Sequence, residues 1–91
     1  MAMEVETART SMLRAAWLFD RGYAMREAAM AKLYASEVAQ RVTWEAIQIH
    51  GGYGYIAEFP VERFWRDARL MTITEGTTEI QLTIIAREIG L

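Results

Sequence analysis

Apolar residues recur at intervals of three and four along most of the chain, and this spacing limits the fold more than any other feature. Such spacing collects apolar side chains on one face of an α-helix, which has about 3.6 residues per turn. A first helix is therefore predicted from Met3 to about Arg21, ending at Gly22. Its apolar positions in phase are Val5, Ala8, Met12, Ala15, Ala16 and Phe19.

A second, longer helix is predicted from about Arg26 to Ile49, because REAAMAKLYASEVAQ is rich in strong helix formers. No Ser, Thr, Asp or Asn stands at Met25, where a cap is expected, so this start is predicted to fray. The positions in phase are mostly small or branched: Ala29, Leu33, Ser36, Val38, Val42 and Ile47. Small residues allow a neighbouring helix to approach closely, which favours a packed bundle helix.

The segment GGYGYIAEFP changes the character of the chain, with three glycines in four positions and Pro60 after them. A loop is predicted here, because glycine permits backbone shapes closed to other residues and proline cannot continue a helix. A short helix from Val61 to about Ala68 is predicted to follow. It would dock through one face, formed by Val61, Phe64, Trp65 and Ala68.

A last helix is predicted after the β-branched, glycine-interrupted stretch LMTITEGTT. Thr78 and Gln81 have the spacing of a capping box at its start. Its apolar stripe would consist of Ile80, Ile84, Ile85 and Ile89. The sequence as a whole predicts an all-α fold of three substantial helices and one short helix.

The apolar content exceeds what so short a chain can bury. Of the 91 residues, 53% are hydrophobic, including three Trp, four Tyr and six Met. A single domain of this length is near the lower size limit for an independent core. We therefore expect part of the apolar surface to meet a partner.

Charge and composition exclude several classes of function. The net charge is −2 and neither sign forms a block, which argues against binding to nucleic acid or to an anionic membrane. No apolar stretch approaches the roughly 20 residues needed for a membrane span, so a soluble protein is expected. The absence of cysteine excludes disulfides and thiolate chemistry, and a single histidine predicts no metal cluster.

Four features could carry chemistry. Glu75 precedes the last helix, where an acid either complements the helix dipole or, in apolar surroundings, serves as a proton acceptor. The glycines of HGGYGY either end a helix or cradle an anion, and they match neither a Rossmann fingerprint nor a P-loop. His50 fits a C-terminal cap or a packing residue. The charged residues Arg63, Arg66, Asp67 and Arg69 fit a salt-bridged helix face better than a phosphate site.

Four segments in order, EAAMAKLYASEVA, QIHGGYGY, FPVERFWRDAR and TEGTTEIQ, resemble the C-terminal domain of the acyl-CoA dehydrogenases. That family has an N-terminal helical domain, a middle β domain and a C-terminal four-helix bundle. The resemblance implies that residues 1–91 form part of this C-terminal domain, without its first helix and without the two preceding domains. Two positions depart from the family pattern: Thr74 stands where Tyr often precedes the acid, and Leu82 replaces a frequent Arg.

The resemblance also implies the site. Glu75 matches the catalytic base that removes the α proton of an acyl-CoA thioester, and Gly76 matches a residue that lies against the substrate. The resemblance further implies FAD contacts, made by Thr77, Thr78 and Glu79 in one group and, toward the neighbouring subunit's FAD, by Gln48, Ile49, His50, Gly51 and Gly52 in another. No metal is implied.

The partners implied are an acyl-CoA substrate, an electron-transfer flavoprotein and further copies of the chain, in a dimer or tetramer. The expected location is the cytoplasm in a bacterium or the mitochondrial matrix in a eukaryote. The isolated chain is expected to bind FAD weakly and to be inactive, because most of the flavin site is missing. Two alternatives stay open: a non-catalytic, self-associating helical fragment, and an enzyme of the acyl-CoA oxidase type, which uses oxygen.

Overall fold

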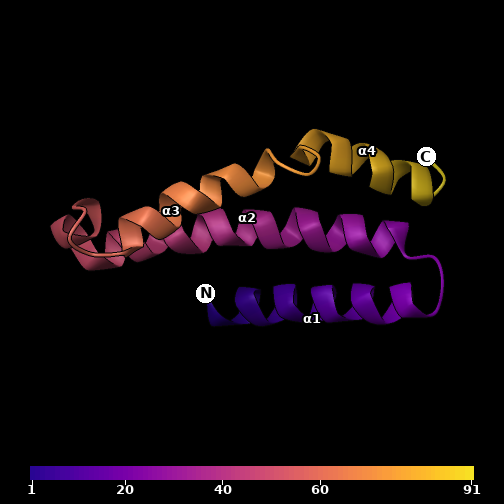
Figure 1. Ribbon diagram of the computed structural model, residues 1–91, viewed down its shortest axis with the longest axis horizontal. Helices are drawn as coiled ribbons and strands as arrows, with labels where there is room; N and C mark the ends of the chain where they lie inside the picture. Colours follow the sequence, from indigo (N-terminus) through magenta and orange to yellow (C-terminus); the bar gives the residue numbers. More distant parts are fainter.

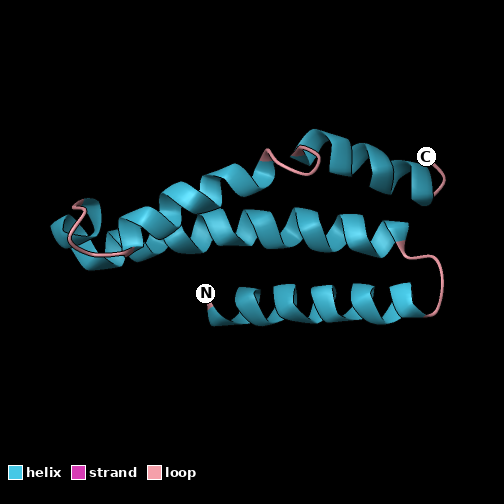
Figure 2. Ribbon diagram, in the orientation of Figure 1, coloured by secondary structure: helices cyan, strands magenta, loops and turns pink.

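The computed structural model describes residues 1–91 and contains helices and turns with no strand (Figure 2). The four α-helices are α1 (Ala2–Asp20), α2 (Met25–His50), α3 (Val61–Arg69) and α4 (Thr78–Glu88). Two short 3-10 helices, η1 (Gly51–Tyr55) and η2 (Leu70–Thr72), follow α2 and α3. The prediction of an all-α fold with three substantial helices and one short helix is confirmed.

Helix α2 is the spine of the molecule, because α1 packs along one side of it while α3 and α4 follow each other along another (Figure 1). The molecule measures 46 × 23 × 18 Å. The 26 residues of α2 span about 39 Å, which accounts for most of the longest dimension. The position of every other element is therefore set by its contacts with α2.

The predicted helix ends differ from the observed ones by only one residue for α1 and α2. Helix α1 begins at Ala2 and ends at Asp20, and the Gly22 that follows has φ +139°, in the region that favours glycine. Helix α2 runs from Met25 to His50 and has no side-chain cap at its start, as predicted. Gly51 ends α2 with φ +65°.

The loop predicted for GGYGYIAEFP is wrong over its first five residues, which form η1. Gly54 explains why this turn can close onto α2. It is buried, and a Cβ at this position would lie 2.7 Å from the carbonyl oxygen of Ile47. Glycine here serves close backbone packing, so the turn folds back on the helix instead of extending from it.

The core consists mainly of small residues, which bring the helices close together. The buried apolar residues are Ala15, Ala24, Ala29, Ala31, Val38, Val61 and Ala68. Between α1 and α2 there is a cavity of about 210 Å³, lined by Val5, Ala8, Ala35, Val38, Ala39, Val42 and Thr43. The predicted close approach of a neighbouring helix to the small residues of α2 is therefore present.

Most large apolar side chains lie outside this core. Phe19 and Tyr23 are each 72% exposed, and Trp17 is 56% exposed. The docking face predicted for α3 is only half correct, since Val61 and Ala68 are buried while Phe64 is 50% exposed. Ile80 on α4 and Ile89 directly after it are exposed, and the buried residue of α4 is Gln81. The apolar residues exceed what this chain buries, as its composition predicted.

Candidate functional site

Glu75 lies in the tight turn between η2 and α4, in a backbone conformation that few residues adopt. Its φ is +57°, and it is the only non-glycine residue in the chain with positive φ. The next residue, Gly76, has φ +95°. A left-handed conformation costs a non-glycine residue about 1–2 kcal/mol, so contacts elsewhere must hold Glu75 in place.

Side chains from two helices supply those contacts. The Gln81 amide on α4 donates from Nε2 to the Glu75 carbonyl oxygen at 3.2 Å. The Lys32 ammonium on α2 donates from Nζ to the Gly76 carbonyl oxygen at 2.6 Å. Gln81 is 7% exposed, so its hydrogen bond is shielded from water. The carbonyl groups on both sides of Gly76 are thus held from α2 and α4.

Thr77 begins the helix that follows. It is the N-cap of α4, and its hydroxyl accepts a hydrogen bond from the Ile80 backbone N–H at 3.3 Å. The predicted capping box of Thr78 and Gln81 is therefore wrong by one position. Ile80, three residues after the cap, has no side-chain group to return the bond, and the Gln81 side chain is bonded to Glu75 instead.

Beside the turn lies an open hollow of about 320 Å³, and Glu75 forms part of its wall. The other lining residues are Lys32, Ala35, Ser36 and Ala39 of α2, with Met71 and Thr74 before the turn. Glu75 is exposed and forms no ion pair within the chain. Its carboxylate is therefore available to a group that enters this hollow.

The second group of predicted site residues lies far from Glu75, at the other end of α2. Gln48, Ile49, His50, Gly51 and Gly52 are all exposed there. Gln48 is sixteen residues after Lys32 on α2, which corresponds to about 24 Å along the helix axis. Nδ1 of His50 lies 2.8 Å from the carbonyl oxygen of Ala46 in the last turn of α2. The predicted FAD residues thus form two separate groups, one beside Glu75 and one at the end of α2.

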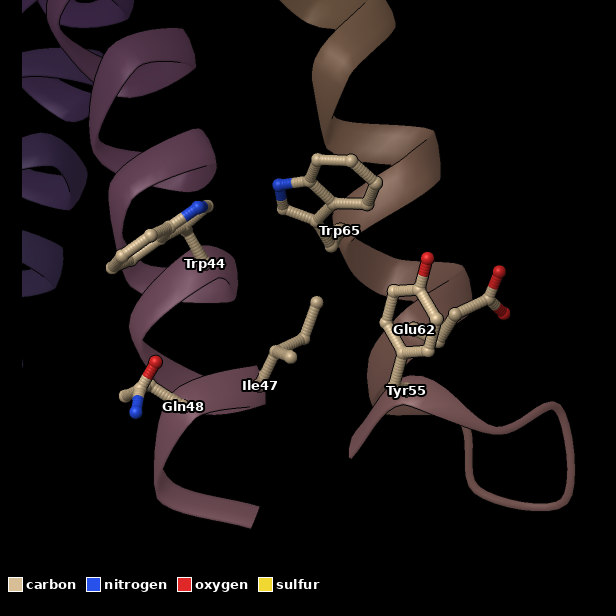
Figure 3. Close-up of a pocket in the computed structure, with 6 residues that line it drawn as sticks. All are labelled: Trp44, Ile47, Gln48, Tyr55, Glu62 and Trp65. Carbon is tan, nitrogen blue, oxygen red and sulfur yellow. The ribbon is translucent and has the colours of Figure 1, made fainter. Parts of the chain in front are cut away.

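The structure also brings together an aromatic hollow of about 500 Å³ that the sequence did not suggest. It lies between the end of α2, which contributes Trp44, Ile47 and Gln48, and α3, which contributes Glu62 and Trp65, with Tyr55 of η1 beside them (Figure 3). Only Gln48 was among the predicted site residues. The aromatic residues are ten or more positions apart, so no local motif joins them before the chain folds.

Two of the charged residues around α3, Arg66 and Arg69, have polar partners on the same helix or directly after it. Arg66 pairs with Glu62 at 3.1 Å, and Arg69 donates to the hydroxyl of Thr72 at 2.9 Å. This arrangement agrees with a salt-bridged helix face. No group of three or more His, Asp or Glu side chains is placed to hold a metal ion. None of the helices combines the length and the apolar character that a membrane crossing requires.

Comparison with known proteins places these features in a family. The family "Acyl-CoA dehydrogenase, C-terminal domain" matches residues 1–90. A probable acyl-CoA dehydrogenase of Bacillus subtilis is 57% identical over 98% of this chain and 24% of its own length. The caffeyl-CoA reductase–Etf complex subunit CarC of Acetobacterium woodii is 48% identical over 94% of this chain and 23% of its own length.

Among solved structures, butyryl-CoA dehydrogenase of Megasphaera elsdenii superposes with a TM-score of 0.95 at 47% identity. That match covers 98% of this chain and 24% of the other. The chain therefore spans about a quarter of the length of the proteins it matches. With the whole sequence and the whole fold matched, the chain belongs to the acyl-CoA dehydrogenase family, whose C-terminal helical domain it represents.

Proposed function

We propose that this chain is the C-terminal part of an FAD-dependent acyl-CoA dehydrogenase in which Glu75 is the catalytic base. The observation that carries the proposal is the backbone of Glu75, the one non-glycine residue with positive φ, held by hydrogen bonds on both sides of Gly76. Strained conformations that the surrounding structure maintains cluster at active sites. The strain and the family resemblance point to the same residue.

In the proposed reaction, the Glu75 carboxylate removes the α proton of an acyl-CoA thioester, and the product is the trans-2-enoyl-CoA. The β hydrogen would leave as hydride, and FAD held by the residues described below would supply the two-electron oxidant that this step needs. The exposed, unpaired carboxylate at the wall of an apolar hollow suits a base that meets an acyl chain. The acyl chain would also exclude water from the carboxylate and favour proton transfer to it.

The residues proposed to hold FAD fit a dinucleotide in two ways. The amides of Thr78 and Glu79 open α4, where backbone N–H groups without helical partners can meet phosphate oxygens. A Cβ built on Gly51 or Gly52 would meet nothing within 4 Å, so a ligand can approach their backbone closely. Because the first group lies beside Gln40 in the middle of α2 and the glycine group lies at the C-terminal end of that helix, we assign the glycine group to the FAD of a neighbouring subunit.

We also propose that function requires the rest of a longer enzyme, including the first helix of the bundle and the two preceding domains. The exposed Trp17, Phe19 and Tyr23 give such parts an apolar surface to cover. In the complete enzyme the electron acceptor would be an electron-transfer flavoprotein, and the similarity to a subunit of an Etf complex supports that partner. Alone, the chain should bind FAD weakly and show no turnover.

The test is the substitution Glu75→Gln in the complete enzyme that carries this domain. The amide keeps the size of the side chain but cannot accept the proton, so dehydrogenation should be lost while bound flavin is retained. Glu58→Gln is the matched control, since Glu58 is exposed in the loop before α3 and forms no ion pair. Turnover retained in the Glu75 variant would remove that residue from the role of base.

A second candidate function rests on the same exposed apolar residues. Copies of the isolated chain could pair through these faces and form a non-catalytic helical assembly. Light scattering combined with the visible absorption spectrum, measured with and without added FAD, distinguishes a self-associating fragment from a chain that binds flavin. A concentration-dependent mass without a flavin band supports self-association alone. A flavin band that an acyl-CoA bleaches would show that the chain assembles a working site by itself.

A further inference from the structure

Lys32 is the only lysine in the chain; the other nine basic residues are arginines. Its ammonium forms no ion pair with any acid of the chain. Instead, Nζ donates to the Gly76 carbonyl oxygen at 2.6 Å, across 44 positions of sequence. A partly buried cation directed at a backbone carbonyl next to the base suggests a role in the geometry of the site.

We propose that Lys32 is the positioning residue for Glu75. This inference rests on the proposed function, in which Glu75 is the base. The Lys32–Gly76 hydrogen bond joins the first third of α2 to the turn that carries Glu75. A charge-assisted bond is stronger than a neutral one, so it can offset the cost of the left-handed backbone at Glu75.

The hydrogen bonds from Gln81 and from Lys32 tie the turn to different helices. Gln81 belongs to α4, which begins directly after the turn, so its bond to Glu75 only fixes the turn relative to that helix. Lys32 belongs to α2, which also supplies Ala35, Ser36 and Ala39 to the wall of the hollow beside Glu75. The Lys32 bond is therefore the side-chain hydrogen bond that ties the turn directly to the helix that forms the opposite wall of the hollow.

Lys32 also lines the hollow, but its ammonium is bonded to the Gly76 carbonyl oxygen. Its role is therefore assigned through Glu75, and its removal should affect the chemical step more than binding. Lys32→Met keeps the aliphatic stem and removes the ammonium. In the complete enzyme we expect kcat to fall about 10- to 100-fold, the range for loss of a hydrogen bond to a charged group. KM and flavin content should change less than about 3-fold, within the usual scatter of context.

Two further measurements separate positioning from a general loss of structure. With substrate deuterated at the α carbon, the isotope effect on kcat should rise in Lys32→Met, because proton abstraction by a displaced base becomes more rate-limiting. Lys32→Arg should recover most of the lost kcat, since guanidinium can also donate to the Gly76 carbonyl. Gln40→Met is the matched control. Gln40 also lies on α2 and donates to Thr72, the last residue of η2, at 2.7 Å, but it forms no hydrogen bond with Glu75 or Gly76.

The outcomes distinguish this inference from the proposed function. If Glu75→Gln abolishes turnover but Lys32→Met behaves like Gln40→Met, the positioning role is wrong and the base assignment stands. If Lys32→Met loses flavin in proportion to activity, with kcat per flavin unchanged, Lys32 is structural and the inference is again wrong. If Glu75→Gln keeps turnover, the proposed function itself fails. A lower kcat with unchanged KM, a larger isotope effect and recovery by arginine support the inference.

Discussion

Gly76→Ala should destabilise the turn at Glu75 by two separate effects. Gly76 has φ +95°, so an alanine there is strained, at a cost of about 1–2 kcal/mol. Its Cβ would lie 2.6 Å from Nε2 of Gln81, which is much closer than two such atoms can approach. Gln81 must then move, and the hydrogen bond to the Glu75 carbonyl is lost at a further cost of about 0.5–1.5 kcal/mol.

The lower entropy of an alanine in the unfolded chain returns about 0.4–1 kcal/mol of this cost. The net loss in the free energy of unfolding should therefore be about 0.5–3 kcal/mol. Urea titration of the purified chain, followed by circular dichroism of the helices, measures it. The energetic cost of the backbone strain can be separated from that of the steric clash, because the clash requires the Gln81 side chain.

A double-mutant cycle with Gln81→Ala makes that separation. In the Gln81→Ala background, Gly76→Ala should cost only the backbone strain, so the two substitutions together should cost less than the sum of each alone. The expected coupling is about 0.5–1.5 kcal/mol, equal to the hydrogen bond counted in both single variants. Additive costs would refute the reasoning, since they would mean that Gln81 does not constrain Gly76.

Two further predictions concern the ends of α4. Thr77→Ala removes the N-cap hydroxyl and should cost about 0.5–2 kcal/mol in urea titration, whereas Thr78→Ala, which removes no cap, should stay within about 0.5 kcal/mol. The hydrogen bond that Tyr23 donates to Glu88 raises the pKa of Tyr23 above its ordinary value of 10.0, so its stabilising contribution is complete below pH 10 and lost as pH rises through the raised pKa. The urea concentration at the unfolding midpoint should fall as pH rises above 10. Tyr23→Phe should remove the part of that fall due to this tyrosine. If the variant shows the same dependence of the midpoint on pH as the parent chain, the stabilising role assigned to the Tyr23–Glu88 hydrogen bond is wrong.

The helices were predictable from sequence because their signals are local. Apolar spacing, the glycine after α1 and the small residues of α2 placed both long helices to within one residue. The cap of α4 was placed one residue too late, because both Thr77 and Thr78 can cap a helix and only the observed backbone selects Thr77. The turn η1 was missed because it depends on the contact of Gly54 with α2.

The candidate site was predictable only in part, because part of it depends on contacts between residues that are distant in sequence. Glu75 could be singled out by its position before a helix and by its resemblance to the family base. Its left-handed backbone and the hydrogen bond from Lys32 could not, since they depend on a contact between residues more than forty positions apart. The aromatic hollow likewise requires α2, η1 and α3 to be in place. Contacts distant in sequence leave no periodic signal.

Ala35 and Ala39 line the hollow beside Glu75 and also the cavity between α1 and α2. These two alanines therefore lie between the hollow beside Glu75 and the surface of α2 on which α1 packs. A bulkier residue at either position would therefore alter both the hollow beside Glu75 and the cavity between α1 and α2. A displacement of α1 would therefore change the packing at two residues that also line the hollow beside Glu75, which couples the position of α1 to the shape of that hollow.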